Sequence, residues 1–200
     1  NGSYLLGNIP FAQYAKVDFD FSYTHLVDKK NSLVYHLGLG VGVPYLNSTI
    51  LPFEKRYYGG GANSVRGWSA RSLGPGSYNA GTKVDYMKQS GDIKLDLNLE
   101  YRTKLVWLLE LAAFIDAGNI WTLKDEGQAG GQFKFDKFYE QIALGYGIGI
   151  RLNFDYFVLR LDWGIKAFDP SRGDGERWRF VPGWNILKDT ALHFAVGYPF

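Results

Sequence analysis

Cysteine is absent from this 200-residue chain, and histidine and methionine are scarce, with three and one residues. The lack of cysteine excludes thiolate metal ligands, thiol nucleophiles and disulfides. His25, His36 and His193 lie on separate predicted strands without a paired ligand spacing, so we expect no metal site. With 22 Lys and Arg against 20 Asp and Glu, the formal net charge is only +2, which gives no overall field that would recruit nucleic acid.

Long apolar runs are also missing. No segment approaches the roughly 18 consecutive apolar residues that a membrane-spanning helix requires. Residues 1–10 lack the basic start and apolar core of a signal peptide. The chain is nevertheless 46% hydrophobic and 17% aromatic, which suits either one soluble domain or part of a membrane barrel. Any membrane-spanning segment must therefore be a strand.

In place of long apolar runs, the sequence contains segments in which apolar and polar residues alternate. In residues 33–45, for example, Leu37 and Leu39 face one side while His36, Gly38 and Gly40 face the other. The last segment places Phe194, Tyr198 and Phe200 on one face. Seven segments show this period of two: 11–26, 33–45, 92–102, 105–117, 144–151, 159–166 and 191–200. The sequence therefore predicts seven strands and an all-β fold.

The connections alternate in length, which is typical of an outer-membrane barrel with short periplasmic turns and long external loops. Short turns are predicted near 28–31, 103 and 154, and long loops at 46–90, 118–141 and 167–189. A soluble β-sandwich is the alternative, but it explains less easily the many charges opposite aromatic-rich strand faces. Because seven is odd and an open sheet edge is not tolerated in lipid, we expect further strands before Asn1.

Residues 53–68 combine a glycine turn with one arginine between two predicted strands. The turn and the residues after it are Gly59, Gly60, Gly61, Ser64, Val65, Arg66, Gly67 and Trp68. Gly74-Pro75 follows, residues 114–121 read Phe-Ile-Asp-Ala-Gly-Asn-Ile-Trp, and the sequence ends on Phe200. In this order the motifs resemble those of the outer-membrane assembly and secretion superfamily that includes BamA, TamA and mitochondrial Sam, also described as the bacterial surface antigen domain. The last five residues look most like TamA-type members.

The resemblance implies an antiparallel transmembrane β-barrel of about 16 strands. Residues 1–200 are then its C-terminal part, about seven strands with loop six at about 46–90, and the upstream strands and POTRA modules lie outside this sequence. It also implies an assembly factor in the bacterial outer membrane that helps to insert and fold β-barrel or autotransporter-like clients. Its partners would be the lipid bilayer, unfolded clients and accessory assembly subunits, with no nucleic acid, no cofactor and no enzymatic activity. The alternatives are a two-partner polypeptide secretion transporter of the same superfamily and, less favoured, a porin or an outer-membrane enzyme.

Arg66 is the central candidate residue of the loop. Its planar guanidinium can make two parallel hydrogen bonds to a carboxylate, which lysine cannot reproduce. Glu100 and Asp116 match the family's lumenal carboxylates, so the resemblance implies that they hold Arg66 and fasten the loop inside the barrel. Glu110 shares the face of Asp116 and competes with Glu100. The alternative interpretation is a solvated arginine and ordinary lumenal charges.

The last strand carries a second candidate signal, made of Phe194, Gly197, Tyr198 and Phe200. These residues resemble the signal by which outer-membrane strands are presented to the assembly machinery. Any last barrel strand, however, is also expected to be amphipathic and aromatic.

Overall fold

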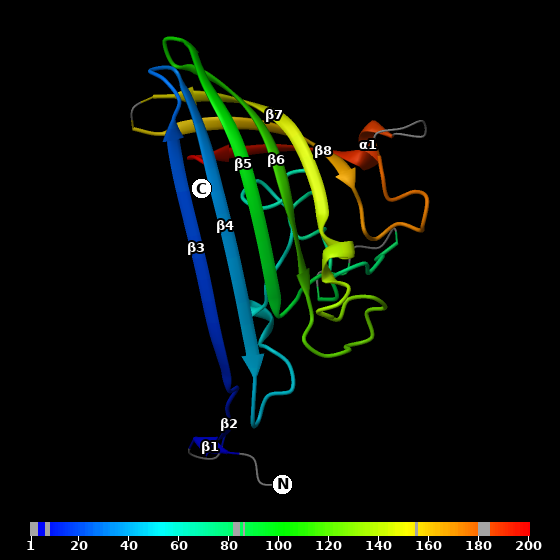
Figure 1. The fold of residues 1–200 in the computed structure, drawn as a ribbon. Helices are drawn as coiled ribbons and strands as arrows, with labels where there is room; N and C mark the ends of the chain where they lie inside the picture. Colours follow the sequence, from blue (N-terminus) through cyan, green and yellow to red (C-terminus); the bar gives the residue numbers. More distant parts are fainter. Residues whose placement is uncertain (1–3, 7–8, 82–84, 86, 155, 180–184) are drawn as a thin grey trace.

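Seven antiparallel strands form one sheet in the computed structural model, which describes residues 4–6, 9–81, 85, 87–154, 156–179 and 185–200. Each strand pairs with the next along the chain, in the order β3-β4-β5-β6-β7-β8-β9 (Figure 1). Their bounds are β3 (Tyr14–Leu26), β4 (Asn31–Pro44), β5 (Ile93–Val106), β6 (Leu109–Trp121), β7 (Ala143–Asn153), β8 (Val158–Phe168) and β9 (Thr190–Val196). The predicted all-β, seven-strand antiparallel arrangement is confirmed.

The remaining elements are short. The strands β1 (Leu5–Leu6) and β2 (Ile9–Pro10) pair with each other near the start of the chain. The helices are η1 (Phe53–Lys55), η2 (Phe138–Gln141) and α1 (Ile186–Asp189). None of the helices in the described residues has the length and apolar character needed to cross a membrane.

The sheet is strongly curved, and its two faces differ in polarity. Apolar side chains such as Ile115 and Ile148, which are 58% and 60% exposed, cover the convex face. The opposite positions along the same strands carry buried charges, among them Asp116 and Arg151. This arrangement reverses that of a water-soluble sheet, because the apolar face is the uncovered one. It fits strands whose outer face meets lipid and excludes the sandwich interpretation.

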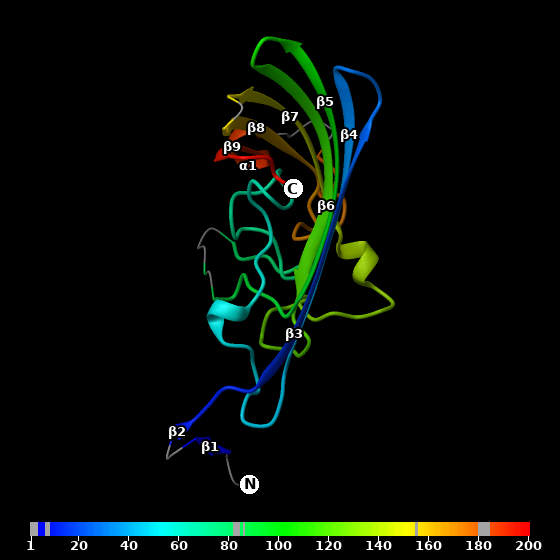
Figure 2. The same ribbon diagram turned by 90° about the vertical axis from the view of Figure 1, so that its left-hand side faces the viewer.

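The loop between β4 and β5 comprises residues 45–92, and its described residues lie on the concave side of the sheet (Figures 1 and 2). Small residues on β4 make room for it. A side chain at Gly42 would collide with Leu51, and one at Gly40 would collide with the Tyr57 ring. Leu51 and Tyr57 are themselves buried, so the loop packs directly on the strand backbone.

One turn lies further along the chain than expected. We predicted a turn near Thr103, but β5 continues to Val106 and the turn is made by Trp107 and Leu108. Pairing extends past Thr103 because Lys104 lies opposite Glu110, with an irregularity in the register before Val106. Trp107 then reverses the chain with a φ of 51°.

The end of the chain differs from the predicted strand over 191–200. The strand β9 ends at Val196, and Gly197 turns the backbone with a φ of 90°. Tyr198 and Phe200 therefore leave the outer face on which Phe194 remains exposed. The Phe200 ring stacks on His36, with centroids 4.7 Å apart and planes 4° from parallel. The prediction that Phe194, Tyr198 and Phe200 share one face is wrong, because the glycine lets the aromatic tail fold back onto the concave face.

Candidate loop-anchoring site

Arg66 is fully buried and joins the 45–92 loop to two strands. Its Nε and Nη2 donate to the two oxygens of Asp116, each at 2.8 Å, and its backbone N–H donates to Asp116 Oδ2 at 3.0 Å. Its remaining terminal nitrogen, Nη1, donates to Glu100 Oε2. The structure thus brings together Arg66 and both carboxylates named from the sequence, and the contact to Asp116 has the bidentate geometry specific to arginine.

The pairing of β5 with β6 places these two carboxylates close together on the lumenal face. Asp116 on β6 lies opposite Asn98 on β5, and Glu100 lies one step further along on the same lumenal face. The Asn98 side-chain amide donates to Asp116 Oδ1 at 2.8 Å and to the Ser64 carbonyl at 2.9 Å. Asn98 therefore orients the carboxylate and holds the loop residue two positions before Arg66.

A second layer of charge surrounds this contact. Arg151 on β7 bridges Glu100 at 3.0 Å and Asp162 at 2.6 Å. Arg160 on β8 donates to Asp162 at 3.0 Å, to the Ala62 carbonyl at 2.8 Å and to the Asn63 side chain. Arg102 donates to the other oxygen of Glu100 at 2.7 Å.

The innermost charges of this cluster balance. The buried arginines are Arg66, Arg151 and Arg160, and the buried carboxylates are Glu100, Asp116 and Asp162. Removal of any one member leaves an uncompensated charge out of contact with water, which is far more costly than the loss of a surface ion pair. The cluster is thus a specific fastening rather than a loose patch of lumenal charge.

Arg151, Arg160 and Asp162 also belong to the Arg66 site, although the sequence motifs do not identify them as part of it. Strand alternation correctly gives their side of the sheet. It does not give their height along the barrel, which depends on the stagger between strands. Asp162 lies opposite Gly149, and Arg151 lies opposite Arg160. Arg151 also lies opposite Glu110, so its guanidinium reaches Glu100 and Asp162 by extending over the side-chain-free surface of Gly149.

Aromatic and backbone contacts complete the surroundings of Arg66. Its guanidinium carbon lies 3.5 Å from the centroid of the Phe114 ring, a cation–π arrangement. The Arg66 carbonyl accepts a hydrogen bond from His193 Nε2 on β9 at 2.9 Å. A side chain at Gly164 on β8 would collide with that carbonyl, and its Cβ would lie 2.9 Å from the Gly67 nitrogen. Gly164 thereby allows the loop to lie against β8.

The other residues of the glycine motif form a compact turn that presents Arg66. Gly60 and Gly61 have φ angles of 82° and 103°, in the region that other residues rarely adopt. The Ser64 hydroxyl donates to Asp96 at 2.7 Å. The motif also supplies a small apolar core in which Val65 and Trp68 pack with Leu73 and Ala143. Gly59 pairs with Leu73 in an isolated bridge.

Glu110 does not contact Arg66. It accepts a hydrogen bond from the Tyr198 hydroxyl at 3.1 Å and one from Asn153 at 3.4 Å. Of the two competitors, Glu100 is therefore the one in the Arg66 cluster. The tail residue Tyr198 occupies the position near Glu110, where Arg102 lies 4.3 Å from its ring centroid.

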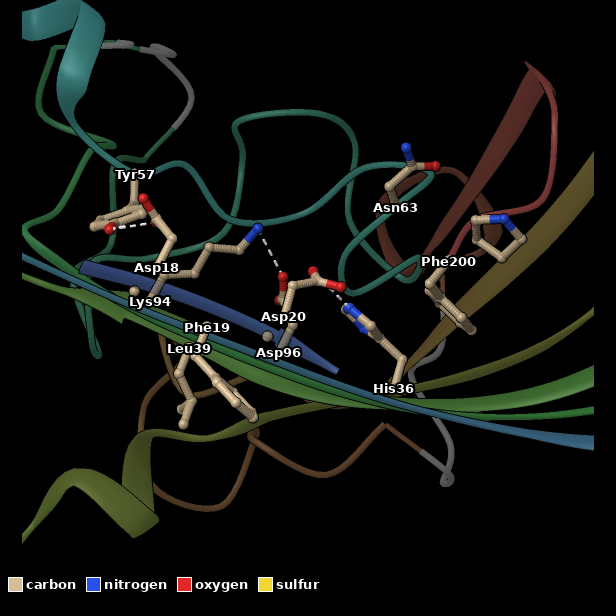
Figure 3. A pocket seen from close by; sticks show the side chains of 13 residues that line it. Asp18, Phe19, Asp20, His36, Leu39, Tyr57, Asn63, Lys94, Asp96 and Phe200 are labelled. Atoms are coloured by element: carbon tan, nitrogen blue, oxygen red, sulfur yellow. Dashed lines mark hydrogen bonds and ion pairs between the residues drawn. The ribbon is translucent and has the colours of Figure 1, made fainter. Parts of the chain in front are cut away.

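A cavity of about 450 Å³, lined by both charged and aromatic side chains, opens beside the cluster, over β3 and β4 (Figure 3). Here the Tyr57 hydroxyl donates to Asp18 at 2.6 Å, and His36 Nε2 lies 3.1 Å from Asp20. Burial, followed by the hydrogen bond and charge of Asp18, raises the pKa of Tyr57, so this hydroxyl remains a donor. Within the described part of the chain, no group of three or more His, Asp or Glu residues is placed to hold a metal ion.

The chain is similar to known proteins in both sequence and fold. A family model described as the Omp85 superfamily domain matches residues 1–186. Over 115 residues the chain is 29% identical to the outer membrane protein assembly factor BamA of Neisseria meningitidis serogroup B, an alignment that covers 54% of this chain and 14% of that protein.

Two solved structures share the fold over 92% of the chain. One is BamA from Haemophilus ducreyi lacking POTRA domains 1–3, with a TM-score of 0.62, 17% identity and 35% of its own length covered. The other is CdiB from Acinetobacter baumannii, with a TM-score of 0.52, 19% identity and 27% of its length covered. The chain thus corresponds to about a third or less of each solved protein.

Proposed function

The chain belongs to the Omp85 superfamily and is an outer-membrane β-barrel protein, and we propose that it helps to insert and fold β-barrel or autotransporter-like clients. The similarity to a protein named as an outer-membrane assembly factor supports this reading. We further propose that these 200 residues are the C-terminal part of a barrel of about 16 strands that follows POTRA modules. The activity requires strand pairing and no bond-making chemistry.

The observation that carries the proposal is the buried attachment of the 45–92 loop to β5, β6 and β8. Arg66, Glu100 and Asp116 have no exposed surface, so this wall is held firmly from within. The sheet edges in the described residues are β3 and β9, and β9 has seven residues where β8 has eleven. The strands attached to the loop resist distortion, whereas the short strand β9 has fewer backbone hydrogen bonds to lose. The barrel is therefore expected to open at the β9 edge and not between the attached strands.

An opened edge offers unpaired backbone N–H and C=O groups. A client strand can pair with such an edge by β-augmentation, in which backbone hydrogen bonds give affinity largely independent of sequence. Lipid cannot satisfy these groups, so the edge must be closed either by another barrel strand or by a client. In this mechanism Arg66 latches the loop and does not act as a catalyst.

The test is reconstitution of the intact protein into lipid vesicles, followed by addition of an unfolded barrel client. We expect faster client folding, measured as the heat-modifiable fraction on electrophoresis, and a slower rate with Arg66→Ala. Empty vesicles and vesicles that contain an unrelated barrel are the controls. If the client folds equally fast with the unaltered protein, with empty vesicles and with the unrelated barrel, the proposed assembly function is wrong.

A secretion transporter of the same superfamily is the second candidate. The observation that favours it is the position of the 45–92 loop on the concave side, where it can occlude a pore (Figure 2). Planar-bilayer conductance separates the candidates. A transporter or porin should conduct steadily once Arg66→Ala releases the loop, without accelerating client folding, whereas an assembly factor should accelerate folding before any steady conductance arises.

A further inference from the structure

The loop between β6 and β7, residues 122–142, covers part of the convex face. Figures 1 and 2 show η2 on the side of the sheet opposite the 45–92 loop. The anchor is Trp121, the last residue of β6, which is 1% exposed. Its ring makes edge contacts with Phe133 at 5.7 Å and Phe138 at 6.3 Å, and its Nε1 donates to Gln141 at 2.8 Å. The loop is therefore held at this end of the membrane-facing surface.

The outer surface of this segment is aromatic. Phe135 is 85% exposed and Tyr139 is 59% exposed, and their ring centroids lie 6.0 Å and 6.1 Å from that of Phe138. Exposed aromatic rings next to an apolar, lipid-facing surface are characteristic of the level at which membrane meets water. The segment is part of a long loop, and the long loops of outer-membrane barrels are on the external side. It therefore lies at the level of the outer leaflet.

Cations accompany these rings. Lys134 and Lys137 are exposed, and neither forms an ion pair with another residue in the described ranges. Together with Arg177 they line a polar cavity of about 330 Å³. Long lysine side chains beside inserted aromatic rings can extend to the headgroup layer and pair with phosphate.

The same cavity also has groups that accept hydrogen bonds. Asp125, Gln128 and Glu140 belong to its lining. The side chains of Asp125 and Glu140 are exposed, so their carboxylates can accept hydrogen bonds from a ligand. An acceptor of this kind suits a hydroxyl group and not a phosphate. Lysines for phosphate beside acceptors for hydroxyls match a phosphorylated sugar better than a simple phosphodiester.

We propose that residues 133–141 dock on an outer-leaflet lipid whose headgroup is a phosphorylated sugar. Phe135 and Tyr139 enter the region just below the headgroups, Lys134 and Lys137 pair with phosphate, and the exposed carboxylates of Asp125 and Glu140 accept from sugar hydroxyls. The continuity of the segment with the lipid-facing sheet surface and its charge complementarity identify a membrane lipid as the occupant. Client folding is not needed for this interaction.

The test is a lipid titration of the intact protein in detergent, followed by native mass spectrometry. The probes are diphosphorylated lipid A, its dephosphorylated form and inorganic pyrophosphate. We expect diphosphorylated lipid A to bind at least fivefold more tightly than the dephosphorylated form. The Lys134→Gln/Lys137→Gln double variant should remove this preference. Lys29→Gln/Lys30→Gln, in the exposed short turn after β3, should retain it.

A further pair of substitutions separates the two parts of the surface. Phe135→Ser/Tyr139→Ser should weaken both lipids to a similar extent, because it removes insertion and leaves the lysines in place. Equal affinity of the unaltered protein for the two lipids would overturn the proposal, as would an undiminished phosphate preference in Lys134→Gln/Lys137→Gln. Full displacement of lipid A by equimolar pyrophosphate would assign the site to soluble phosphate and contradict lipid docking.

Discussion

The 45–92 loop is attached to the barrel wall at two places that differ in their physics. At the charged anchorage, Arg66 is held by Asp116 and Glu100 in a fully buried ion-pair cluster. At the apolar anchorage, Leu51 and Tyr57 pack on β4 at Gly42 and Gly40. Apolar contacts stabilise the buried loop but do not depend strongly on orientation. The two parallel hydrogen bonds between a guanidinium group and a carboxylate form only within a narrow range of distances and angles. The apolar anchorage therefore keeps the loop inside, and the charged anchorage fixes its position.

The two anchorages also lie on different parts of the sheet. The charged anchorage joins β5 and β6 in the middle of the sheet and extends to β7 and β8, whereas the apolar anchorage packs on β4 and reaches the edge strand β3 through the hydrogen bond from Tyr57 to Asp18. Near β3 the charges are loosely held: Lys16 and Asp18 are 3.8 Å apart, with the Asp18 side chain 60% exposed. An exposed pair of this kind contributes about 0–1 kcal/mol. The β3 side is thus the weaker half of the attachment.

Arg66→Ala should reduce the stability of the protein more than any other variant, because it removes the central arginine of the charged anchorage. We expect about 3–5 kcal/mol of destabilisation, since buried carboxylates lose their partner. The stability of Arg66→Lys should lie between those of the unaltered protein and Arg66→Ala. Lysine keeps the positive charge but cannot make the two parallel hydrogen bonds of the guanidinium group. The measurement is urea unfolding of the intact protein in bilayers. Equal stability of all three proteins would show that the ion pairs contribute nothing net.

Leu51→Ala tests the apolar anchorage in the same assay. Loss of this buried side chain should cost about 2–3 kcal/mol, with no change in salt dependence. The control is Ile50→Ala, since its neighbour Ile50 is 52% exposed and should matter little. Similar losses in both variants would mean that Leu51 is not a specific contact.

Gly164→Ala should push the loop away from β8 without removing any charge. The added methyl group meets the Arg66 carbonyl, so we expect about 1–3 kcal/mol of destabilisation from overpacking. Gly173→Ala is the matched control, because nothing lies within 4 Å of the added Cβ at Gly173. If Gly164→Ala is as stable as Gly173→Ala, the close approach of loop and strand is not a constraint.

The smallest effect concerns Asp189 in α1, a charged contact outside both anchorages. Burial raises the pKa of Asp189, but hydrogen bonds from Arg179 and the Asn185 N–H, with the charge of Arg172, outweigh it, so the net pKa is lowered. A lowered folded-state pKa gives stability that is complete above the unfolded value of about 3.9 and is lost as pH falls through the folded value.

We therefore expect pepsin to cleave the chain near Asp189 increasingly once the pH falls below the lowered folded-state pKa of Asp189, where this carboxylate becomes protonated. Asp189→Asn should remove this component of the pH dependence, while Leu51→Ala should leave it unchanged. Identical pH profiles for Asp189→Asn and the unaltered protein would exclude Asp189 as the responsible group.

Much of the fold could be predicted from the sequence because a period of two fixes which side each strand residue occupies. The same reasoning failed at the C-terminus, where alternation continues to Phe200 although Gly197 ends the strand at Val196. A positive φ at one glycine leaves no trace in the hydrophobic pattern. Alternation alone also cannot supply strand stagger, which is why Asp162 and Arg160 were not assigned to the Arg66 cluster.

The candidate contact of Arg66 with Glu100 and Asp116 came from the resemblance to a family and not from periodicity. Periodicity left Glu110 as a competitor of Glu100, because Glu110 shares a face with Asp116. The structure separates them by register: Glu110 lies opposite Lys104, near the short turn, and Glu100 lies opposite Phe114. Side-chain height in the barrel, and not the face, distinguishes the two carboxylates.

A double-mutant cycle between Arg66 and Asp116 tests the charged anchorage most directly. Stability of the intact protein in bilayers would be measured for Arg66→Ala, Asp116→Ala and the double variant. Because the pair is buried and joined by three hydrogen bonds, we predict a coupling free energy of about 2–3 kcal/mol, with the double variant much less destabilised than the sum of the single variants. Additive losses, with coupling below about 0.5 kcal/mol, would contradict the latch.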